Sequence, residues 1–391
     1  MKIKKIYIGG WFQRTILQLT EVYDFFREAS SQLPLDKNEL FKLHKALDIK
    51  EIKYSVDGLE FVSVSTNSDV CFKIYEDGLI LLSDDEVEAS SLYSELEAIT
   101  EYYEKHLSPT LSYLFSLGAP IPKELANIKT VYPYFIVFDN ATDKEIDEVL
   151  NAIEKQKYYK FSNDNLDIIR GEKYYFINSK RKKADQIERY VEEQIFIREF
   201  KGQLHRYLNL HRIIWEKIDS VKNSPHVKGK DILKFNSTID GYSKTINLID
   251  TRINQMDTYL HTREKIAKND EDLKEFLEIM GYRYEALNDT LKYIQQLWTM
   301  TKNYVNSAKE TFGDLEQRVT QKSIENLSFI TSIGVGSSLM FLLSTPEITS
   351  IGLISLVVLV IAGYAIIKIM GFVYENKKYE ISDINYDKDI K

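Results

Sequence analysis

The stretch that decides the fold runs from residue 273 to residue 319 and reads LKEFLEIMGYRYEALNDTLKYIQQLWTMTKNYVNSAKETFGDLEQRV. Its apolar residues recur at alternating spacings of four and three, with Thr301 as one polar member; they are Leu277, Met280, Tyr284, Leu287, Leu291, Ile294, Trp298, Val305, Ala308, Phe312, Leu315 and Val319. A heptad repeat of this length is typical of a helix packed along its whole length. We therefore predict a helical stalk over residues 179–326, packed on itself in an oligomer or on the preceding helices. The alternative is an ordinary amphipathic helix on a globular core.

Two apolar segments follow the heptad helix. Residues 327–343 carry no charge, Ser344 to Glu347 interrupts the pattern, and residues 351–373 are apolar apart from Lys368. About 20 apolar residues suffice to cross a bilayer. We therefore predict a two-helix transmembrane hairpin over residues 327–373, followed by a cytosolic tail over residues 374–391. The alternative is a pair of buried core helices.

Basic residues flank this hairpin on both sides. Arg318 and Lys322 precede it, Lys377 and Lys378 follow it, and the intervening loop has no basic residue. Because positively charged loops stay in the cytosol, we expect a multi-pass protein of the inner (cytoplasmic) membrane with both termini cytosolic. Lys368 is interpreted as an anchor near the membrane surface.

The first 178 residues have a different pattern. Short strand-like runs alternate with helical ones, and Asp77-Gly78 between apolar runs indicates a hairpin. Strands are predicted over residues 4–8, 51–56, 59–65, 70–75, 79–82, 132–139, 167–169 and 173–177, and helices over 15–29, 83–115 and 142–155. Ser83 to Glu86 is interpreted as a capping box that opens the second helix. The predicted fold class is α+β: an N-terminal α/β cytosolic sensor domain over residues 1–178, the stalk, and two C-terminal transmembrane helices.

Composition excludes several classes of protein. The net charge is −8, with 51 basic and 59 acidic residues interspersed, so no nucleic-acid partner is expected. Cys71 is the single cysteine and excludes an internal disulfide, which fits a reducing compartment. The sequence also lacks a phosphate-binding loop, a zinc-protease motif and a nucleophile elbow, and His205 and His211 are not at metal-ligand spacing. We do not expect an enzyme, and no metal site is assigned.

The heptad face continues into the first apolar segment. Its members there are Ile324, Leu327, Thr331, Val335, Ser338 and Leu342, and we predict that they line a pore. Ser344, Thr345 and Glu347 are placed at the pore entrance. The alternative is that this face only packs helix on helix.

The order of these parts resembles the CorA family of divalent-cation channels over nearly the whole chain. The Gly-Met-Asn signature of that family is absent, and Thr345-Pro346-Glu347 stands in its place. The resemblance implies a homopentamer in a lipid bilayer with a pore on its axis, and Glu347 would ring the entrance. It also implies a divalent cation as a ligand, although the missing signature leaves magnesium specificity open.

The start Ile8-Gly9-Gly10-Trp11-Phe12-Gln13-Arg14-Thr15 resembles a divergent CorA-like subgroup associated with type III CRISPR systems. This resemblance implies an antiviral effector channel gated by a nucleotide second messenger, such as an S-adenosylmethionine–AMP conjugate (SAM-AMP) or a cyclic oligoadenylate. Two other classes stay open: a constitutive magnesium or divalent-cation transporter, and a non-conducting membrane-anchored scaffold.

Two places have groups that suit a nucleotide ligand. Trp11, Gln13 and Arg14 follow a glycine pair, and Lys180, Arg181, Lys182 and Lys183 form the densest basic run. Phosphate needs backbone amides or cations, and a base needs an aromatic or amide surface. The simpler interpretations are a turn at the glycine pair and a solvated helix face at the basic run.

Overall fold

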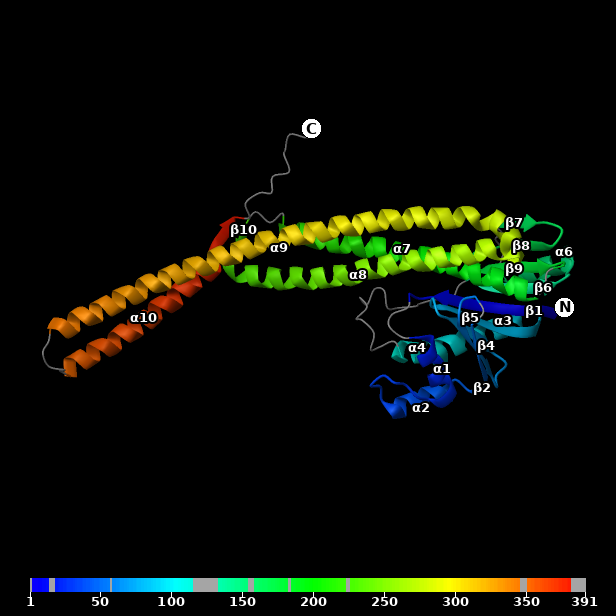
Figure 1. Ribbon diagram of the computed structural model, residues 1–391, viewed down its shortest axis with the longest axis horizontal. Coiled ribbons are helices and arrows are strands. Elements are labelled where there is room, and N and C mark those ends of the chain that lie inside the picture. Colours follow the sequence, from blue (N-terminus) through cyan, green and yellow to red (C-terminus); the bar gives the residue numbers. More distant parts are fainter. Residues whose placement is uncertain are drawn as a thin grey trace, which may run out of the picture. The chain divides into compact units, whose positions relative to one another are not determined.

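The computed structural model describes residues 2–13, 18–56, 58–114, 133–153, 158–181, 184–222, 226–344 and 350–380 (Figure 1). The helices are α1 (Leu19–Glu28), α2 (Lys37–Ala46), α3 (Leu92–Tyr102), the π-helical turn η1 (Tyr103–Leu107), α4 (Ser108–Leu114), α6 (Asp143–Ile153), α7 (Ala184–Lys222), α8 (Gly229–Asn269), the 3-10 turn η3 (Glu271–Leu273), α9 (Lys274–Ser344) and α10 (Ser350–Asn376). The strands are β1 (Lys2–Trp11), β2 (Ile49–Ser55), β3 (Phe61–Thr66), β4 (Cys71–Tyr75), β5 (Leu79–Glu88), β6 (Tyr134–Asp139), β7 (Tyr159–Ser162), β8 (Leu166–Arg170), β9 (Tyr174–Ser179), β10 (His226–Lys228) and β11 (Lys378–Glu380).

The chain forms two compact units. Unit 1 consists of Met1–Leu208 and Thr251–Gln295, and unit 2 consists of Asn209–Asp250 and Gln296–Lys391. Helices α7, α8 and α9 each contribute residues to both units. Unit 1 therefore joins the strand-rich N-terminal part to helical segments that follow it in sequence.

A nine-stranded sheet is the centre of unit 1. Its strand order is β2-β3-β4-β5-β1-β6-β9-β8-β7. Only β6 and β9 pair in parallel among these neighbours, and the other pairs are antiparallel. The predicted strands are confirmed, and the structure adds β7, whose exposed Tyr159 and Lys160 gave no apolar signal.

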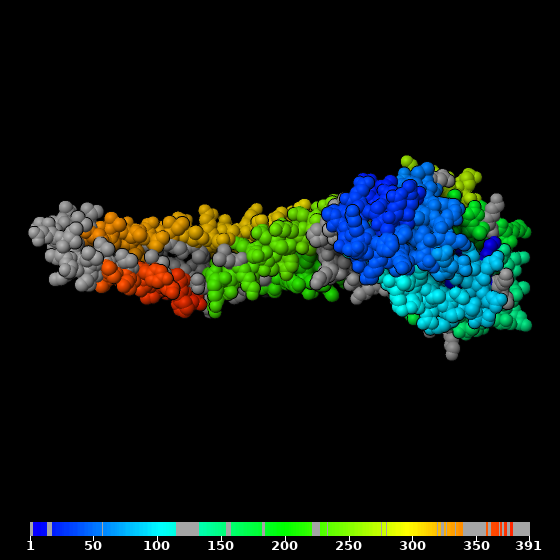
Figure 2. Space-filling view, turned by 90° about the horizontal axis from the view of Figure 1, so that it is seen from below, coloured from blue at the N-terminus to red at the C-terminus, as the bar shows by residue number. Residues whose placement is uncertain are grey.

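The two faces of this sheet pack on different helices (Figure 1). On one face, Ile6, Phe72 and Leu82 join a core with apolar residues of α1, α2, α3, α4 and α6. The next residue along each strand points to the other face, because side chains alternate in a strand. There Trp11 of β1 packs on Phe196 of α7 with ring centroids 5.5 Å apart. In Figure 2 the N-terminal elements, coloured blue to cyan, form the visible face of this unit.

The α3 helix passes into α4 through the π-helical turn η1. Pro109 stands just after this turn, and the amide of Ser108 donates to the carbonyl of Tyr103, five residues earlier. Proline has no N–H to donate, and in an α-helix its ring collides with the carbonyl four residues before it. The wider turn relieves that collision without ending the helix.

The predicted heptad helix is confirmed by burial along α9. From Met280 to Leu315 the members of the repeat are buried, and the polar member Thr301 is fully buried as well. Its Oγ1 donates to the carbonyl of Leu297 at 2.9 Å, which satisfies the hydroxyl within its own helix. The helix predicted over residues 142–155 is confirmed as α6, and it begins with a capping box: Thr142 N donates to Glu145 Oε2 at 2.9 Å and Glu145 N donates to Thr142 Oγ1 at 3.4 Å.

The prediction of two membrane-spanning helices over residues 327–373 is wrong. Within the described ranges, no helix carries a stretch that is long and apolar enough to cross a bilayer. The apolar segments are helical, as the end of α9 and α10, but small and polar residues such as Ser332, Gly334 and Ser338 interrupt the first. The fold class with a transmembrane hairpin and the assignment to the inner membrane as a multi-pass protein are corrected accordingly.

The capping box predicted at Ser83 is also wrong. Ser83 lies within β5, opposite Tyr7 of β1, and the strand continues to Glu88. Helix α3 begins only at Leu92. Glu86 has φ of 57°, so the acidic run bends locally but stays in the strand. The hydrogen bonds between β5 and β1 stabilise the strand more than a cap formed by Ser83 to Glu86 would stabilise a helix.

The close packing of β1 on α7 predicts that Gly9→Ala destabilises the protein. An added Cβ would lie 2.6 Å from the carbonyl oxygen of Ile80 and 2.7 Å from Cδ1 of Ile195. We expect a loss of roughly 1–3 kcal/mol in the free energy of unfolding, since backbone must shift to make room. Urea titration followed by circular dichroism measures this loss.

Gly202→Ala is the matched control. Gly202 lies within α7, and an added Cβ there meets nothing closer than 4.0 Å. Alanine is the better helix former, so this variant should be as stable as the wild type or more stable. Equal behaviour of the two variants would contradict the packing role of Gly9.

Candidate functional site

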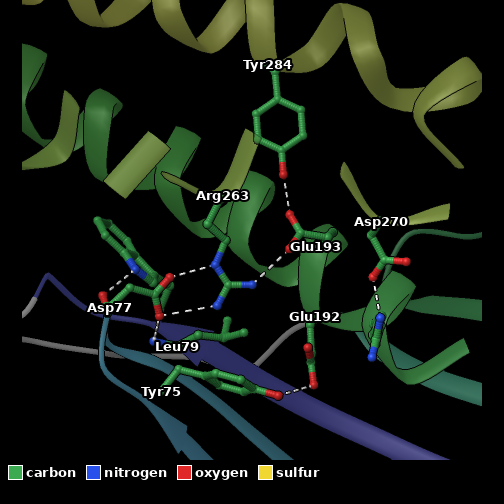
Figure 3. A network of polar contacts seen from close by, with 10 residues as sticks. Tyr75, Asp77, Leu79, Glu192, Glu193, Arg263, Asp270 and Tyr284 are labelled. Carbon is green, nitrogen blue, oxygen red and sulfur yellow. Dashed lines mark hydrogen bonds and ion pairs between the residues drawn. The ribbon is translucent and has the colours of Figure 1, made fainter. Parts of the chain in front are cut away.

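Helix α7 presents three carboxylates to the sheet of unit 1. Glu188, Glu192 and Glu193 are spaced so that they lie on one side of the helix. Glu192 and Glu193 are buried, and the side chain of Glu188 is 14% exposed. Buried carboxylates need cations or donors around them, and the strands and the other long helices supply these groups (Figure 3).

Arg263 of α8 is the central cation of this network (Figure 3). Its Nε and a terminal nitrogen donate to the two oxygens of Asp77 at 2.6 and 3.2 Å. Its other terminal nitrogen donates to Glu193 at 3.0 Å, and the hydroxyl of Tyr284 donates to the same carboxylate. The guanidinium thus ties the β4–β5 turn to α7, α8 and α9.

The rest of the arginine is held by aromatic rings and by the turn itself. Its guanidinium carbon lies 5.4 Å from the ring centre of Tyr75 and 5.1 Å from that of Phe196. Asp77 is fixed from the sheet side, because its carbonyl accepts from the Trp11 indole at 2.8 Å and its carboxylate accepts from the amide of Leu79 at 3.1 Å. This turn has Gly78 at φ of 92°, as the Asp-Gly pair predicted.

Glu188 and Glu192 face the neighbouring strands. Lys73 donates to Glu188, and Lys5 lies 3.5 Å from the same carboxylate. Glu192 accepts a hydrogen bond from the hydroxyl of Tyr75. The Tyr7 hydroxyl also donates to Glu188 at 3.3 Å. The two carboxylates, one turn apart on α7, therefore differ in their cations: Glu188 has two lysines, and in the described part of the chain Glu192 has only a phenol.

The pKa values follow this difference in partners. Burial acts to raise the pKa of Glu188, but Lys73 and Lys5 outweigh it and hold that pKa below its ordinary value. Burial raises the pKa of Glu192 to about 7. Burial also lowers the pKa of Arg263, yet Asp77 and Glu193 outweigh it and keep that guanidinium charged. The network therefore holds both firmly charged groups and one carboxyl that titrates near neutral pH.

Removal of the Arg263 guanidinium should destabilise unit 1 strongly. In Arg263→Met, Asp77 and Glu193 would be buried without their cation, so we expect a loss of roughly 3–5 kcal/mol in the free energy of unfolding. Chemical denaturation at pH 7 measures it. Lys268→Met on the same helix is the control, because it breaks only an exposed pair with Glu264 and should leave stability nearly unchanged. A loss in Arg263→Met no larger than in the control would contradict the central role of the cation.

A second feature of unit 1 is an open pocket of about 570 Å³. It lies between α3, the turn η1 and the starts of β6 and β9; its lining consists of Tyr93, Leu96, Glu97, Thr100, Glu101, Glu104, Lys105, Tyr134, Lys173 and Tyr174. A volume of this size suits a small organic ligand. The π-helical turn contributes Glu104 and Lys105, and such turns are frequent at functional sites.

Parallel pairing of β6 with β9 sets the aromatic wall of this pocket. Tyr134 lies opposite Tyr174, and their rings stack with centroids 5.3 Å apart. The hydroxyl of Tyr134 lies 3.1 Å from Oγ1 of Thr100 on α3. Tyr93 on α3 is 72% exposed and offers a third aromatic surface.

The charges of the pocket are mixed. Glu97, Glu101 and Glu104 are exposed on α3 and η1, and Lys105 pairs with Glu101. Lys173 lies at the entry to β9 and is exposed. The site therefore combines stacking surfaces, hydrogen-bond acceptors and cations.

The structure places Trp11 and Gln13 away from this pocket and inside the protein. Trp11 is 2% exposed and packs on Phe196 and Phe200, and Gln13 is 6% exposed. The hydroxyl of Tyr207 donates to Gln13 Oε1 at 2.7 Å, and Gln13 donates to the carbonyl of Arg252. Both side chains have packing roles, and Arg14 lies outside the described residues.

The basic run is only partly described. Lys180 donates to Asp167 at 2.7 Å and to the carbonyl of Asn163 at 3.0 Å. These contacts fix the start of β8 and the loop that precedes it. Arg181 is exposed, and Lys182 and Lys183 lie outside the described residues. A ligand at this run stays a prediction.

The predicted pore residues lie on the last part of α9. Ile324, Leu327 and Val335 are 57%, 44% and 59% exposed. The hydroxyls of Thr331 and Ser338 donate to carbonyls of their own helix at 2.7 and 2.8 Å. The side chains of Leu342 and Ser344, and all of Thr345 and Glu347, lie outside the described part. The lining of a pore by this face stays a prediction.

Sequence reasoning missed the pocket. The glutamates of α3 have the pattern of a solvated helix face, and nothing in the sequence brings them near Tyr134 and Tyr174. Pro109 inside a helical pattern was the one available signal of an irregular turn. In the described ranges, no group of three or more histidine, cysteine or acidic side chains is arranged to hold a metal ion.

The chain matches no protein-family model, and it matches no curated protein.

Proposed function

We propose that this protein is a non-enzymatic sensor that binds a nucleotide second messenger in the pocket of unit 1 and acts as an antiviral effector. The mixed lining of that pocket carries the messenger-binding part of the proposal. The antiviral part depends on the resemblance of residues 8–15 to the CRISPR-associated CorA-like subgroup. Ion conduction is left out of the proposal because the membrane spans it needs are absent from the described helices.

Each part of a nucleotide has suitable groups in the pocket. A base stacks on aromatic rings, and stacking contributes roughly 1–3 kcal/mol per base in other nucleic-acid-binding proteins. Tyr93 and Tyr174 offer such rings. Carboxylates accept hydrogen bonds from ribose hydroxyls, as in dinucleotide sites, and Glu97 is exposed for this role. Lys173 supplies a cation for a phosphate.

Ligand binding would act on elements that support the whole unit. The pocket walls are α3 with η1 on one side and the starts of β6 and β9 on the other. β6 pairs directly with β1, the strand that carries Trp11 against α7. A ligand that draws α3 towards β6 and β9 therefore acts on the sheet beneath the long helices.

We also propose that copies of the chain associate, with the homopentamer as the expected assembly. Unit 2 exposes large apolar side chains on α9 and α10, among them Phe329, Ile361 and Phe372 at 67%, 61% and 67% exposure. Large exposed apolar side chains in such number are often covered by a partner. In a ring of five copies each contact is heterologous, so this surface of one chain packs on a different part of the next chain.

Messenger binding is tested by calorimetric titration of the full-length protein with SAM-AMP, cyclic oligoadenylates and AMP. We expect Tyr93→Ala and Lys173→Ala each to weaken binding of the cognate messenger about tenfold or more, since each removes a contact to a base or a phosphate. Tyr282→Ala and Lys144→Ala are matched controls, because Tyr282 is 64% exposed on α9 and Lys144 is exposed on α6.

Three outcomes would each contradict a part of this assignment. Absence of binding to every messenger by the wild-type protein contradicts the sensor itself. Unchanged binding in both pocket variants, together with loss in Lys180→Ala or Arg181→Ala, would instead place the ligand at the basic run. Chromatography of the messenger after the titration detects any cleavage. Cleavage would contradict the proposal that the protein is not an enzyme.

Self-association is tested by light scattering coupled to size-exclusion chromatography. We expect the wild-type protein to have a mass several times that of one chain. Phe329→Asp combined with Ile361→Asp should lower this mass, because each aspartate would have to lose water in the interface. Thr320→Asp on α9 is the control, since Thr320 is already an exposed polar residue. A single-chain mass for the wild type would contradict the association.

A further inference from the structure

The junction between sheet and long helices in unit 1 has one buried carboxyl more than it has cations. The carboxyls are Asp77, Glu188, Glu192 and Glu193, and the cations are Lys5, Lys73 and Arg263. Arg263 is used by Asp77 and Glu193. Lys73 is used by Glu188, and Lys5 is shared between Glu188 and the exposed Asp85. Glu192 is left with the hydroxyl of Tyr75.

Glu192 is surrounded on every side by groups that already have partners. In the part of the chain that the structure describes, it has no lysine, arginine or histidine within ion-pair distance. The charged and titratable groups facing the junction are Lys5 and Tyr7 of β1, Lys73 and Tyr75 of β4, Asp77 of the β4–β5 turn, Asp85 of β5, Glu188 and Glu193 of α7, Arg263 of α8 and Tyr284 of α9.

We propose that Glu192 is a proton-operated latch between β4 and α7. The protonated carboxyl is neutral and remains buried against Tyr75 at little cost. The ionised carboxyl is a buried charge without a cation, and it weakens the docking of α7 on the sheet. A phenol can donate to a neutral carboxyl as well as to a carboxylate, so the hydrogen bond persists and only the charge changes.

Each neighbouring carboxyl has a cation within ion-pair distance, although burial raises the pKa of Glu193 as well. Glu188 has two lysines, whose effect on its pKa outweighs that of burial. Asp77 receives two bonds from the guanidinium and one from the Leu79 amide. Glu193 accepts from Arg263 and from Tyr284. Glu192 alone among the four depends on a single neutral donor within the described residues.

The direction of the pH effect follows from the pKa of the folded state. Burial raises the pKa of Glu192 from its ordinary 4.5 to about 7. The folded protein therefore binds the proton more tightly than the unfolded chain does. The stabilisation is fully present below about pH 4.5 and is lost as the pH rises through about 7.

Comparison of Glu192→Gln with the wild type tests the latch. Glutamine retains an acceptor for Tyr75 and removes the titration. We expect the urea midpoint of the variant to rise relative to that of the wild type between pH 5.5 and pH 8.5, because the wild type loses the remaining stabilisation over this range. The part of the pKa shift that lies within this range changes the folding equilibrium by roughly thirtyfold. Burial also raises the pKa of Glu199 to about 7, so Glu199 contributes its own pH dependence to both proteins. The readout is therefore the difference in urea midpoint between variant and wild type at each pH.

Glu188→Gln is the matched control. Its lowered pKa places the titration of Glu188 below this range, so its stability loss should be equal at pH 5.5 and pH 8.5. Tyr75→Phe is a second variant that keeps the ring and removes the donor. Because the Tyr75 hydrogen bond lowers the pKa of Glu192, its loss should move the titration to higher pH.

Infrared difference spectroscopy gives a readout that does not depend on folding stability. The wild type at pH 6 should show the C=O band of a protonated carboxyl that is absent from Glu192→Gln. Absence of that band in the wild type, or pH profiles of wild type and Glu192→Gln that run parallel from pH 5.5 to 8.5, would overturn the proposal.

Discussion

Burial of the Arg263 guanidinium is the constraint on which unit 1 depends. A charge taken out of water costs several kcal/mol unless partners surround it, and here Asp77 and Glu193 lie 186 and 70 residues away in sequence. The ion pairs form only when the β4–β5 turn, α7 and α8 all occupy their native positions. A fold in which α7 slipped by one turn would leave these charges buried and unpaired. The network therefore selects one docking of the helices on the sheet.

Close packing on the same face reinforces that selection. Gly9 lets β1 approach α7 so nearly that the side chain of Ile195 occupies the place of a Cβ. Trp11 then reaches Phe196 with its ring and the Asp77 carbonyl with its indole N–H. The glycine pair at the end of a strand was interpreted as a turn or a phosphate site. Gly9 is instead required because β1 and α7 lie too close together for a side chain at this position. That distance depends on tertiary packing and cannot be predicted from the local sequence.

Local sequence patterns predicted most elements of this fold. They failed where contacts with residues distant in sequence determine the structure. The strand runs, the Asp77-Gly78 hairpin and the buried heptad positions from Met280 to Leu315 were all present in the sequence as periodicities. Ser83 to Glu86 has the local form of a helix cap, yet pairing with β1 holds it in β5. Hydropathy likewise indicated two helices correctly but did not establish membrane spans. No local pattern links Arg263 to Asp77.

The pocket illustrates the same limit for function. Glu97, Glu101 and Glu104 are ordinary exposed residues of α3 and η1 until β6 and β9 bring Tyr134 and Tyr174 beside them. Pro109 accounts for the π-helical form of η1, and this turn contributes Glu104 and Lys105 to the lining of the pocket. The turn can have a structural cause and its residues can still bind a ligand. The site thus arises where the paired starts of β6 and β9 lie beside α3 and η1, and none of these elements by itself indicates a ligand.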